Sequence, residues 1–184
     1  MIEYRKRMIG RLSGMRLFVA LPFPEDVKNR LMKTGQELLA SCRSANLTKK
    51  ENLHLTLAFI GETNDHRSAI RALSGIEQSA FSLTLKGSGH FGDLYWVGVE
   101  KNEALLQLMK KTQTSLRTAG FPIEQRENIP HVTIARRVET DRPPKIAFDE
   151  ITFPCHAFHL MVSERIGGKL TYRSLYRKDL TPLC

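Results

Sequence analysis

Two short segments of this chain repeat an H-x-T-x pattern whose side chains can carry out acid–base chemistry. The first reads His54-Leu55-Thr56-Leu57 and the second reads His131-Val132-Thr133-Ile134. Successive side chains of a β-strand point to opposite faces, so the histidine and threonine of each segment share one face. We therefore predict that each strand buries its aliphatic side and presents an imidazole and a hydroxyl group on the other.

The chemistry that suits two such strands is phosphoryl transfer without a metal ion. An imidazole with an ordinary pKa near 6.5 can be neutral or protonated close to neutral pH. One histidine can take a proton from an attacking water or hydroxyl while its protonated twin gives a proton to the leaving oxygen. The threonine hydroxyls can donate hydrogen bonds to phosphate oxygens, where negative charge must be held in the transition state. This pairing predicts a bell-shaped dependence of the rate on pH.

No other pattern in the sequence indicates a metal or a cofactor. The chain has no H-E-x-x-H motif, no carboxylate cluster, no Cys/His spacing of a metal site and no glycine-rich phosphate loop. The other histidines, which are His66, His90, His156 and His159, do not repeat the H-x-T-x pattern. We therefore expect a site without metal or cofactor.

The elements that must position the two motifs occur in the same order twice. Apolar alternation predicts strands over residues 16–21, 52–61, 81–85, 94–99, 129–136 and 158–162. Helical periodicity predicts helices over about 24–41 and 65–79, and from an Asn102 cap to Gly120. The separation from Phe18 to His54 is 36 residues and from Trp96 to His131 is 35. A lone strand histidine is usually structural, but two copies at matching places favour a functional role.

This order predicts an α+β fold of two pseudo-symmetric lobes with a central cleft between them. Each lobe is expected to be a small, mainly antiparallel sheet with helices on its outer face. Residues 1–14 are interpreted as an N-terminal extension and residues 15–184 as a single bilobal domain. Within that domain we expect two interleaved internal repeats, at about 15–90 and 91–182.

Composition excludes several classes of protein and favours partners of one charge. With 184 residues, 41% of them hydrophobic and 26% charged, the chain is neither disordered, collagen-like nor a disulfide-dense mini-protein. The formal net charge of +9 favours anionic partners such as nucleic acid, a phosphorylated ligand or an acidic membrane surface.

Cysteine usage and apolar run length predict a cytoplasmic protein without a membrane span. The three cysteines are widely spaced, which favours reduced thiols. The longest apolar stretch, residues 17–23, is far below the roughly 20 residues that cross a bilayer. A monomer is expected, because the internal pairing of the two halves already builds the site.

The motifs resemble those of the 2H phosphoesterase superfamily. The resemblance lies in RLFVAL at 16–21, NLHLTLAFIGE at 52–62 and PHVTIAR at 130–136, and extends over about residues 15–182. Within that superfamily the chain is most similar to the bacterial and archaeal RNA 2′,3′-cyclic phosphodiesterases, also called 2′-5′ RNA ligases or LigT-like proteins.

The resemblance implies metal-independent hydrolysis of an RNA 2′,3′-cyclic phosphodiester to a 2′-phosphomonoester. It assigns His54 as proton donor and His131 as proton acceptor, with Thr56 and Thr133 binding the phosphate. The reverse reaction, with a 5′-hydroxyl in place of water, would form a 2′-5′ linkage. From the residues alone the two histidines are interchangeable.

Several other residues are weaker candidates for contact with RNA. Arg136 ends the second motif, although strict alternation turns it away from His131. Arg126 precedes that motif, and a basic hairpin around Gly167-Gly168 carries Ser163, Arg165, Lys169 and Tyr172. The aromatic residues Phe91, Tyr95 and Trp96 are candidates for stacking on a base.

Two alternatives remain open at this stage. A non-catalytic RNA-binding module would use the same fold and the same basic charge. A phosphoesterase of the same type could instead act on another cyclic nucleotide or on a 2′-5′ oligonucleotide.

Overall fold

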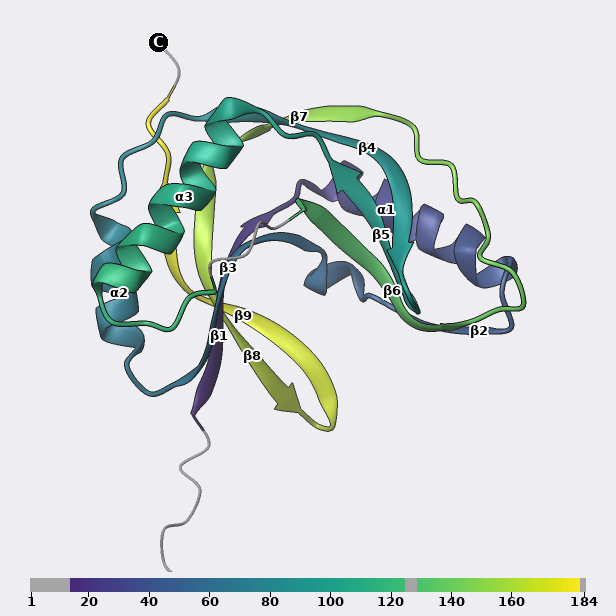
Figure 1. Ribbon diagram of the computed structural model, residues 1–184, viewed down its shortest axis with the longest axis horizontal. Helices are drawn as coiled ribbons and strands as arrows, with labels where there is room; N and C mark the ends of the chain where they lie inside the picture. Colours follow the sequence, from purple (N-terminus) through teal and green to yellow (C-terminus); the bar gives the residue numbers. More distant parts are fainter. Residues whose placement is uncertain (1–13, 125–128, 183–184) are drawn as a thin grey trace, which may run out of the picture.

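Two antiparallel β-sheets and three α-helices make up the part of the chain that the computed structural model describes, residues 14–124 and 129–182 (Figure 1). The strands are β1 (Met15–Pro22), β2 (Ser44–Leu47), β3 (His54–Thr63), β4 (Phe81–Phe91), β5 (Leu94–Val99), β6 (His131–Glu139), β7 (Ile151–Cys155), β8 (Ala157–Ile166) and β9 (Lys169–Asp179). The helices are α1 (Glu25–Ala40), α2 (His66–Ser74) and α3 (Glu103–Thr118), and a short 3₁₀ helix, η1 (Lys50–Asn52), precedes β3. The α+β prediction with mainly antiparallel sheets is confirmed.

The two sheets exchange strands between the two halves of the sequence. One sheet has the order β3-β1-β8-β9 and the other has the order β2-β6-β5-β4-β7. In each sheet an H-x-T-x strand pairs with a strand from its own half, β3 with β1 and β6 with β5. The next strand of each sheet, β8 or β4, comes from the opposite half of the chain. Neither sheet is therefore built from one contiguous segment.

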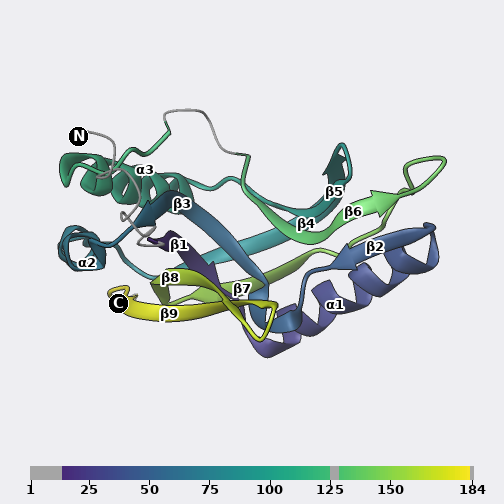
Figure 2. The same ribbon diagram turned by 90° about the horizontal axis from the view of Figure 1, so that it is seen from below.

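The helices cover the sheets from outside. Figures 1 and 2 both show α2 and α3 side by side next to β1 and β3, while α1 lies at the other side of the molecule along β2 and β6. Asn102 caps α3 as predicted, since its side chain accepts a hydrogen bond from the Leu105 amide. Gly120, with a φ of 90°, follows the end of that helix in the left-handed conformation that glycine adopts readily.

The core lies on the aliphatic side of the motif strands. Leu55, Leu57, Val132 and Ile134 are all buried, while the histidine and threonine of each motif are half-buried on the other face. This division follows the period-two alternation that the sequence predicts.

Some element boundaries differ from those predicted. The helix expected near 65–79 ends at Ser74, because Gly75 caps it. The strands β2, β7 and β9 were not predicted, and β4 extends to Phe91 rather than ending at Leu85. The N-terminal extension falls almost wholly on residues 1–13, outside the described residues.

No helix among the described residues is long and apolar enough to cross a membrane.

Candidate functional site

His54 stands at the start of β3 and is held on both ring nitrogens. Its Nδ1 lies 2.7 Å from the main-chain oxygen of Asn52, and its Nε2 lies 3.1 Å from Oγ1 of Thr56. A carbonyl oxygen can only accept, so Nδ1 must carry the proton. In the neutral ring, Nε2 is then the acceptor that faces the Thr56 hydroxyl.

His131 repeats this arrangement at the start of β6. Its Nδ1 lies 2.7 Å from the main-chain oxygen of Ile129, again two residues earlier in the chain. The same reasoning gives it a protonated Nδ1, which leaves Nε2 for other partners. Both motif histidines thus use Nδ1 for a hydrogen bond to the backbone, so Nε2 is the nitrogen that a further group can reach.

The two motif histidines lie on strands that contact each other. Strands β3 and β6 contact each other, although they belong to different sheets. Burial lowers the pKa of His54 below its ordinary value, and the charges of Arg136 and His131 lower it further, against the opposing effect of the hydrogen bond to Asn52. Two charged groups on β6 are therefore close enough to act on a histidine of β3.

The orientation of Arg136 differs from strict alternation because β6 contains a bulge. Opposite β6, the neighbouring residues Tyr95 and Trp96 pair with Ala135 and Thr133, so one extra residue lies in β6. Ile134 and Ala135 are consequently both buried, and Arg136 returns to the face of His131 and Thr133. Strict alternation turns Arg136 away from His131 only where the strand does not bend, and the bulge is such a bend.

Strand β3 carries the same bulge at the matching place. Leu57 and Ala58 are both buried, and the pairing with β1 shifts between Val19 and Ala20. Phe59 therefore returns to the face of His54 and Thr56, where 62% of it is exposed. Phe59 and Arg136 each lie five residues after the motif histidine of their strand. The sequence reading missed Phe59, although two consecutive apolar residues after each H-x-T are the signal of the bulge.

Aromatic rings surround each histidine. Around His54, the ring centroids of Phe18 and Tyr172 lie at 4.9 and 5.3 Å. Around His131, those of Phe91 and Trp96 lie at 5.5 and 6.3 Å. Phe18 is buried and comes from the strand paired with β3, whereas 45% of Phe91 is exposed. The rings fix the imidazoles by packing, and the exposed ones offer apolar faces at the site.

The remaining candidates are only partly described. Arg126 lies outside the described residues. Gly167 and Gly168 form the turn between β8 and β9 with φ values of 55° and 77°, and Arg165 and Lys169 are exposed beside it. Tyr95, a candidate for stacking, is buried and stacks on His90 instead.

Within residues 14–124 and 129–182, no group of three or more His, Cys, Asp or Glu side chains could hold a metal ion.

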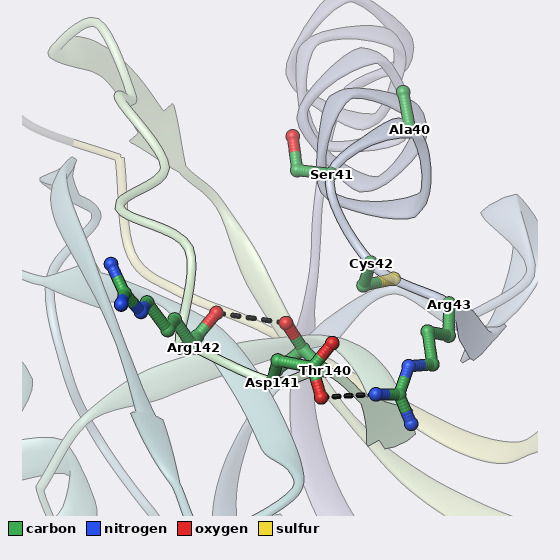
Figure 3. Close-up of a pocket in the computed structure, with 7 residues that line it drawn as sticks. All are labelled: Ala40, Ser41, Cys42, Arg43, Thr140, Asp141 and Arg142. Carbon is green, nitrogen blue, oxygen red and sulfur yellow. Dashed lines mark hydrogen bonds and ion pairs between the residues drawn. The ribbon is translucent and has the colours of Figure 1, made fainter.

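An open hollow of about 430 Å³ lies between the end of α1 and the connection after β6 (Figure 3). Its lining includes the ion-paired Arg43 and Asp141 but neither motif histidine, so it does not contribute to the two-histidine site.

Two strand-exchanged sheets that each bring an H-x-T-x strand to a common site define the two-histidine phosphoesterase class that the motifs resemble. Residues 23–167 match the family model of the 2′-5′ RNA ligase superfamily, and the chain belongs to that superfamily. The resemblance stated from the motifs is thereby confirmed.

Individual relatives cover most of the chain. An RNA 2′,3′-cyclic phosphodiesterase of Thermotoga maritima is 31% identical over 152 residues, or 76% of this chain and 79% of that protein. The protein of the same name from Escherichia coli is 28% identical over 174 residues, or 90% and 97% of the two chains. The crystal structure of E. coli LigT complexed with 3′-AMP matches with a TM-score of 0.81 and 24% identity over 91% of this chain and 99% of that one, which shows a common fold.

Proposed function

We propose that this chain hydrolyses RNA 2′,3′-cyclic phosphodiester ends to 2′-phosphomonoesters by metal-independent two-histidine catalysis. The observation that carries the proposal is the matched pair of imidazoles, each with Nδ1 bonded to a main-chain oxygen. Nε2 is then the nitrogen that can serve the substrate, and in His54 it faces the Thr56 hydroxyl. The relatives named RNA 2′,3′-cyclic phosphodiesterase support the choice of substrate.

In the proposed reaction, His131 accepts a proton from water through Nε2 as the water oxygen attacks phosphorus. The bond from phosphorus to the 3′-oxygen breaks, and His54 gives its Nε2 proton to that oxygen. The product has a 2′-phosphate and a 3′-hydroxyl group. Thr56 and Thr133 donate hydrogen bonds to the non-bridging oxygens, where negative charge accumulates. When a 5′-hydroxyl attacks the cyclic phosphate in place of water, the same proton transfers break the bond to the 3′-oxygen and form a 2′-5′ linkage.

The role of His54 as donor requires a proton that the free site disfavours, because burial and the charge of Arg136 lower its pKa. A bound phosphate diester brings a negative charge next to Nε2, and an opposite charge at that distance favours the protonated ring. His54 therefore gains its proton together with the substrate. Thr56, which in the free site faces Nε2 at 3.1 Å, then turns its hydroxyl to the phosphate.

Arg136 and the exposed rings support an RNA substrate. Arg136 lies on the face of Thr133 and supplies a positive charge close to His54. Phe59 on β3 and Phe91 at the end of β4 are large, exposed rings, which can stack on bases. A monomer in the cytoplasm fits this proposal, since one chain provides both histidines and the thiols of Cys42 and Cys155 are free.

The test measures hydrolysis of an oligonucleotide with a 2′,3′-cyclic end in the presence of a chelator, and it identifies the product phosphate. His54→Ala and His131→Ala are each expected to lower kcat by about 10²- to 10⁴-fold, because each removes one proton-transfer partner. His156→Ala is the matched control, since this exposed histidine lies between β7 and β8. Turnover that survives both motif substitutions, or that the chelator abolishes, would contradict the proposal.

A substrate panel separates the two alternatives. It compares the cyclic-ended oligonucleotide with ADP-ribose 1″,2″-cyclic phosphate and a 2′-5′ oligoadenylate. Faster turnover of either of the other two would reassign the substrate while keeping the mechanism. Salt-sensitive RNA binding without turnover of any of the three would instead indicate an RNA-binding module.

A further inference from the structure

Asn52 is a buried polar residue next to the motif that begins with His54. Only 5% of it is exposed, and it ends η1 two residues before that histidine. A buried polar side chain costs free energy unless it is hydrogen-bonded, so its partners show what it holds in place.

The side chain of Asn52 binds the backbone of β9 at two points. Its Nδ2 donates to the main-chain oxygen of Leu170 at 3.1 Å, and its Oδ1 accepts from the main-chain nitrogen of Tyr172 at 3.3 Å. These two groups are the ones that a neighbouring strand would pair with. Asn52 therefore fastens the start of β9 to the segment that leads into β3, although the two are 118–120 residues apart in sequence.

The same residue also holds the imidazole. The main-chain oxygen of Asn52 accepts from Nδ1 of His54 at 2.7 Å. Tyr172, whose backbone Asn52 binds, packs its ring edge-on against His54 at 5.3 Å and against Phe18 at 4.9 Å. One residue thus fixes both the hydrogen bond that sets the tautomer of His54 and the position of a ring that buries it.

The other half of the molecule lacks this connection. Ile129 occupies the matching position before His131, and its main-chain oxygen accepts from Nδ1 in the same way. Its side chain is apolar and 54% exposed, so it cannot form the two hydrogen bonds that the Asn52 amide makes to Leu170 and Tyr172. We call this pair of hydrogen bonds the Asn52 clamp. The rings beside His131 come from the nearby strands β4 and β5 rather than from a distant hairpin. Among residues 14–124 and 129–182, Asn52 makes this pair of hydrogen bonds next to His54, and Ile129 makes no counterpart next to His131.

We infer that Asn52 is a positioning residue for His54, which it orients by fastening the β8–β9 hairpin to the segment before β3. This inference rests on the proposed function for its catalytic consequence and adds a residue to that same site. Loss of the clamp lets β9 and Tyr172 move away, exposes the imidazole to water and loosens its orientation.

The experiment compares wild-type protein with Asn52→Ala and Asn52→Asp. Both substitutions remove the donor to Leu170, and the carboxylate also places a negative charge near the ring. We expect kcat to fall by about 10- to 100-fold, since small misplacements of a reacting group have effects of that size. KM should change by less than about threefold, because Asn52 does not reach the phosphate ligands. In NMR titrations the pKa of His54 should rise in Asn52→Ala as burial is lost, and further in Asn52→Asp.

Asn102→Ala is the matched control. Asn102 also makes two side-chain hydrogen bonds to the backbone, with the Leu105 amide and the Ser82 oxygen, but it caps α3. It should lower the free energy of unfolding without moving the His54 pKa or kcat. Should Asn52→Ala not fold, Asn52→Leu replaces it, because leucine has a similar volume but no hydrogen-bonding group and no charge that would itself raise the His54 pKa.

An unchanged His54 pKa and Nδ1–H tautomer in both Asn52 variants, with unchanged kcat, would overturn the inference. Failure of the proposed function has a different signature. In that case the wild-type protein does not turn over the cyclic phosphate, whereas the NMR shift of His54 on substitution of Asn52 is still expected.

Discussion

At the scale of single residues, the two motif histidines are held by the same kind of hydrogen bond but lie in different surroundings. Both histidines donate Nδ1–H to a carbonyl two residues earlier. His54 is enclosed by Phe18 and Tyr172, and its pKa is lowered chiefly by burial. In the free protein this lowered pKa disfavours the proton that His54 needs as the proposed donor. The negative charge of a bound phosphate must therefore restore that proton before the two histidines can hold opposite protonation states.

The charge of Arg136 gives the first prediction at this scale. Arg136→Gln removes a positive charge that lowers the pKa of His54, so that pKa should rise toward its ordinary value of 6.5. NMR titration of His54 measures this directly. Because His54 must be protonated to act as the donor, the alkaline limb of the kcat/KM profile should move to higher pH with it. If Arg136 also contacts the substrate, KM rises by about tenfold or more, as expected for the loss of a charged contact.

Arg137→Gln provides the control for that experiment. It removes the same charge from the next residue of β6, which does not contribute to the lowered pKa of His54. Equal shifts of the His54 pKa in both variants would count against a specific effect of Arg136.

At the scale of elements, the strands that carry the motifs were predictable and their irregularities were not. Alternation in residues 52–61 and 129–136 locates β3 and β6, because one face of each is aliphatic. The bulges that turn Phe59 and Arg136 toward the site depend on pairing with β1 and β5, and their one local sign is the pair of consecutive apolar residues after each H-x-T.

The strands that were missed are short, contain a proline or carry many polar residues. Strand β2 has four residues and no buried one. Strand β7 contains Pro154, which the ladder tolerates because β7 is an edge strand. Strand β9 is polar along both faces and gains its position from β8 and from the Asn52 clamp. Asn52 itself is visible in the sequence, but only the fold brings Leu170 and Tyr172 to it.

The β4–β5 hairpin supports His131 through a close approach at Gly89. An added Cβ there would overlap the indole of Trp96, lying 2.6 Å from its Cη2 atom. Gly89→Ala is therefore expected to displace the indole from Phe91 and His131, to destabilise the fold by about 1–3 kcal/mol and to lower activity. Trp96 is the single tryptophan of the chain, so its fluorescence reports the displacement without interference.

Gly75→Ala is the comparison for Gly89→Ala, because a Cβ at Gly75 meets nothing within 4 Å and the residue has no positive φ. An emission spectrum that is the same in Gly89→Ala as in wild type would argue that the indole does not depend on this glycine.

At the scale of the whole molecule, strand exchange makes the site a product of the entire chain. His54 on β3 depends on β1 and on β8 and β9 from the far end of the sequence, while β6 pairs with β5 and, beyond it, β4 from the first half. Loss of packing in either sheet is therefore expected to displace the histidine that the sheet carries. The sequence could indicate this arrangement through the repeated order of elements, but the pairing partners come from the fold alone.

Burial of histidines links the stability of the whole molecule to pH. Burial lowers the pKa of both His54 and His159 in the folded protein, whereas in the unfolded chain each titrates near 6.5. As the pH falls below 6.5, the unfolded state binds protons first, so the free energy of unfolding decreases until the folded-state pKa values are reached. For each histidine the slope is at most about 1.4 kcal/mol per pH unit. Urea unfolding between about pH 8 and about pH 3.5 measures this dependence.

Substitution separates the contributions of the two histidines. His54→Gln and His159→Gln should each flatten the decrease below pH 6.5, and the double variant should flatten it most. The exposed carboxylates of Glu25 and Asp65 do not interfere in this range, because partner groups lower their pKa values from 4.5 and 3.8 and they lose those interactions only at more acidic pH. A free energy of unfolding that falls equally steeply in the double variant would mean that burial of these rings does not set the acid sensitivity of the fold. A steep decrease confined to pH below 4.5 would assign it to carboxylates instead.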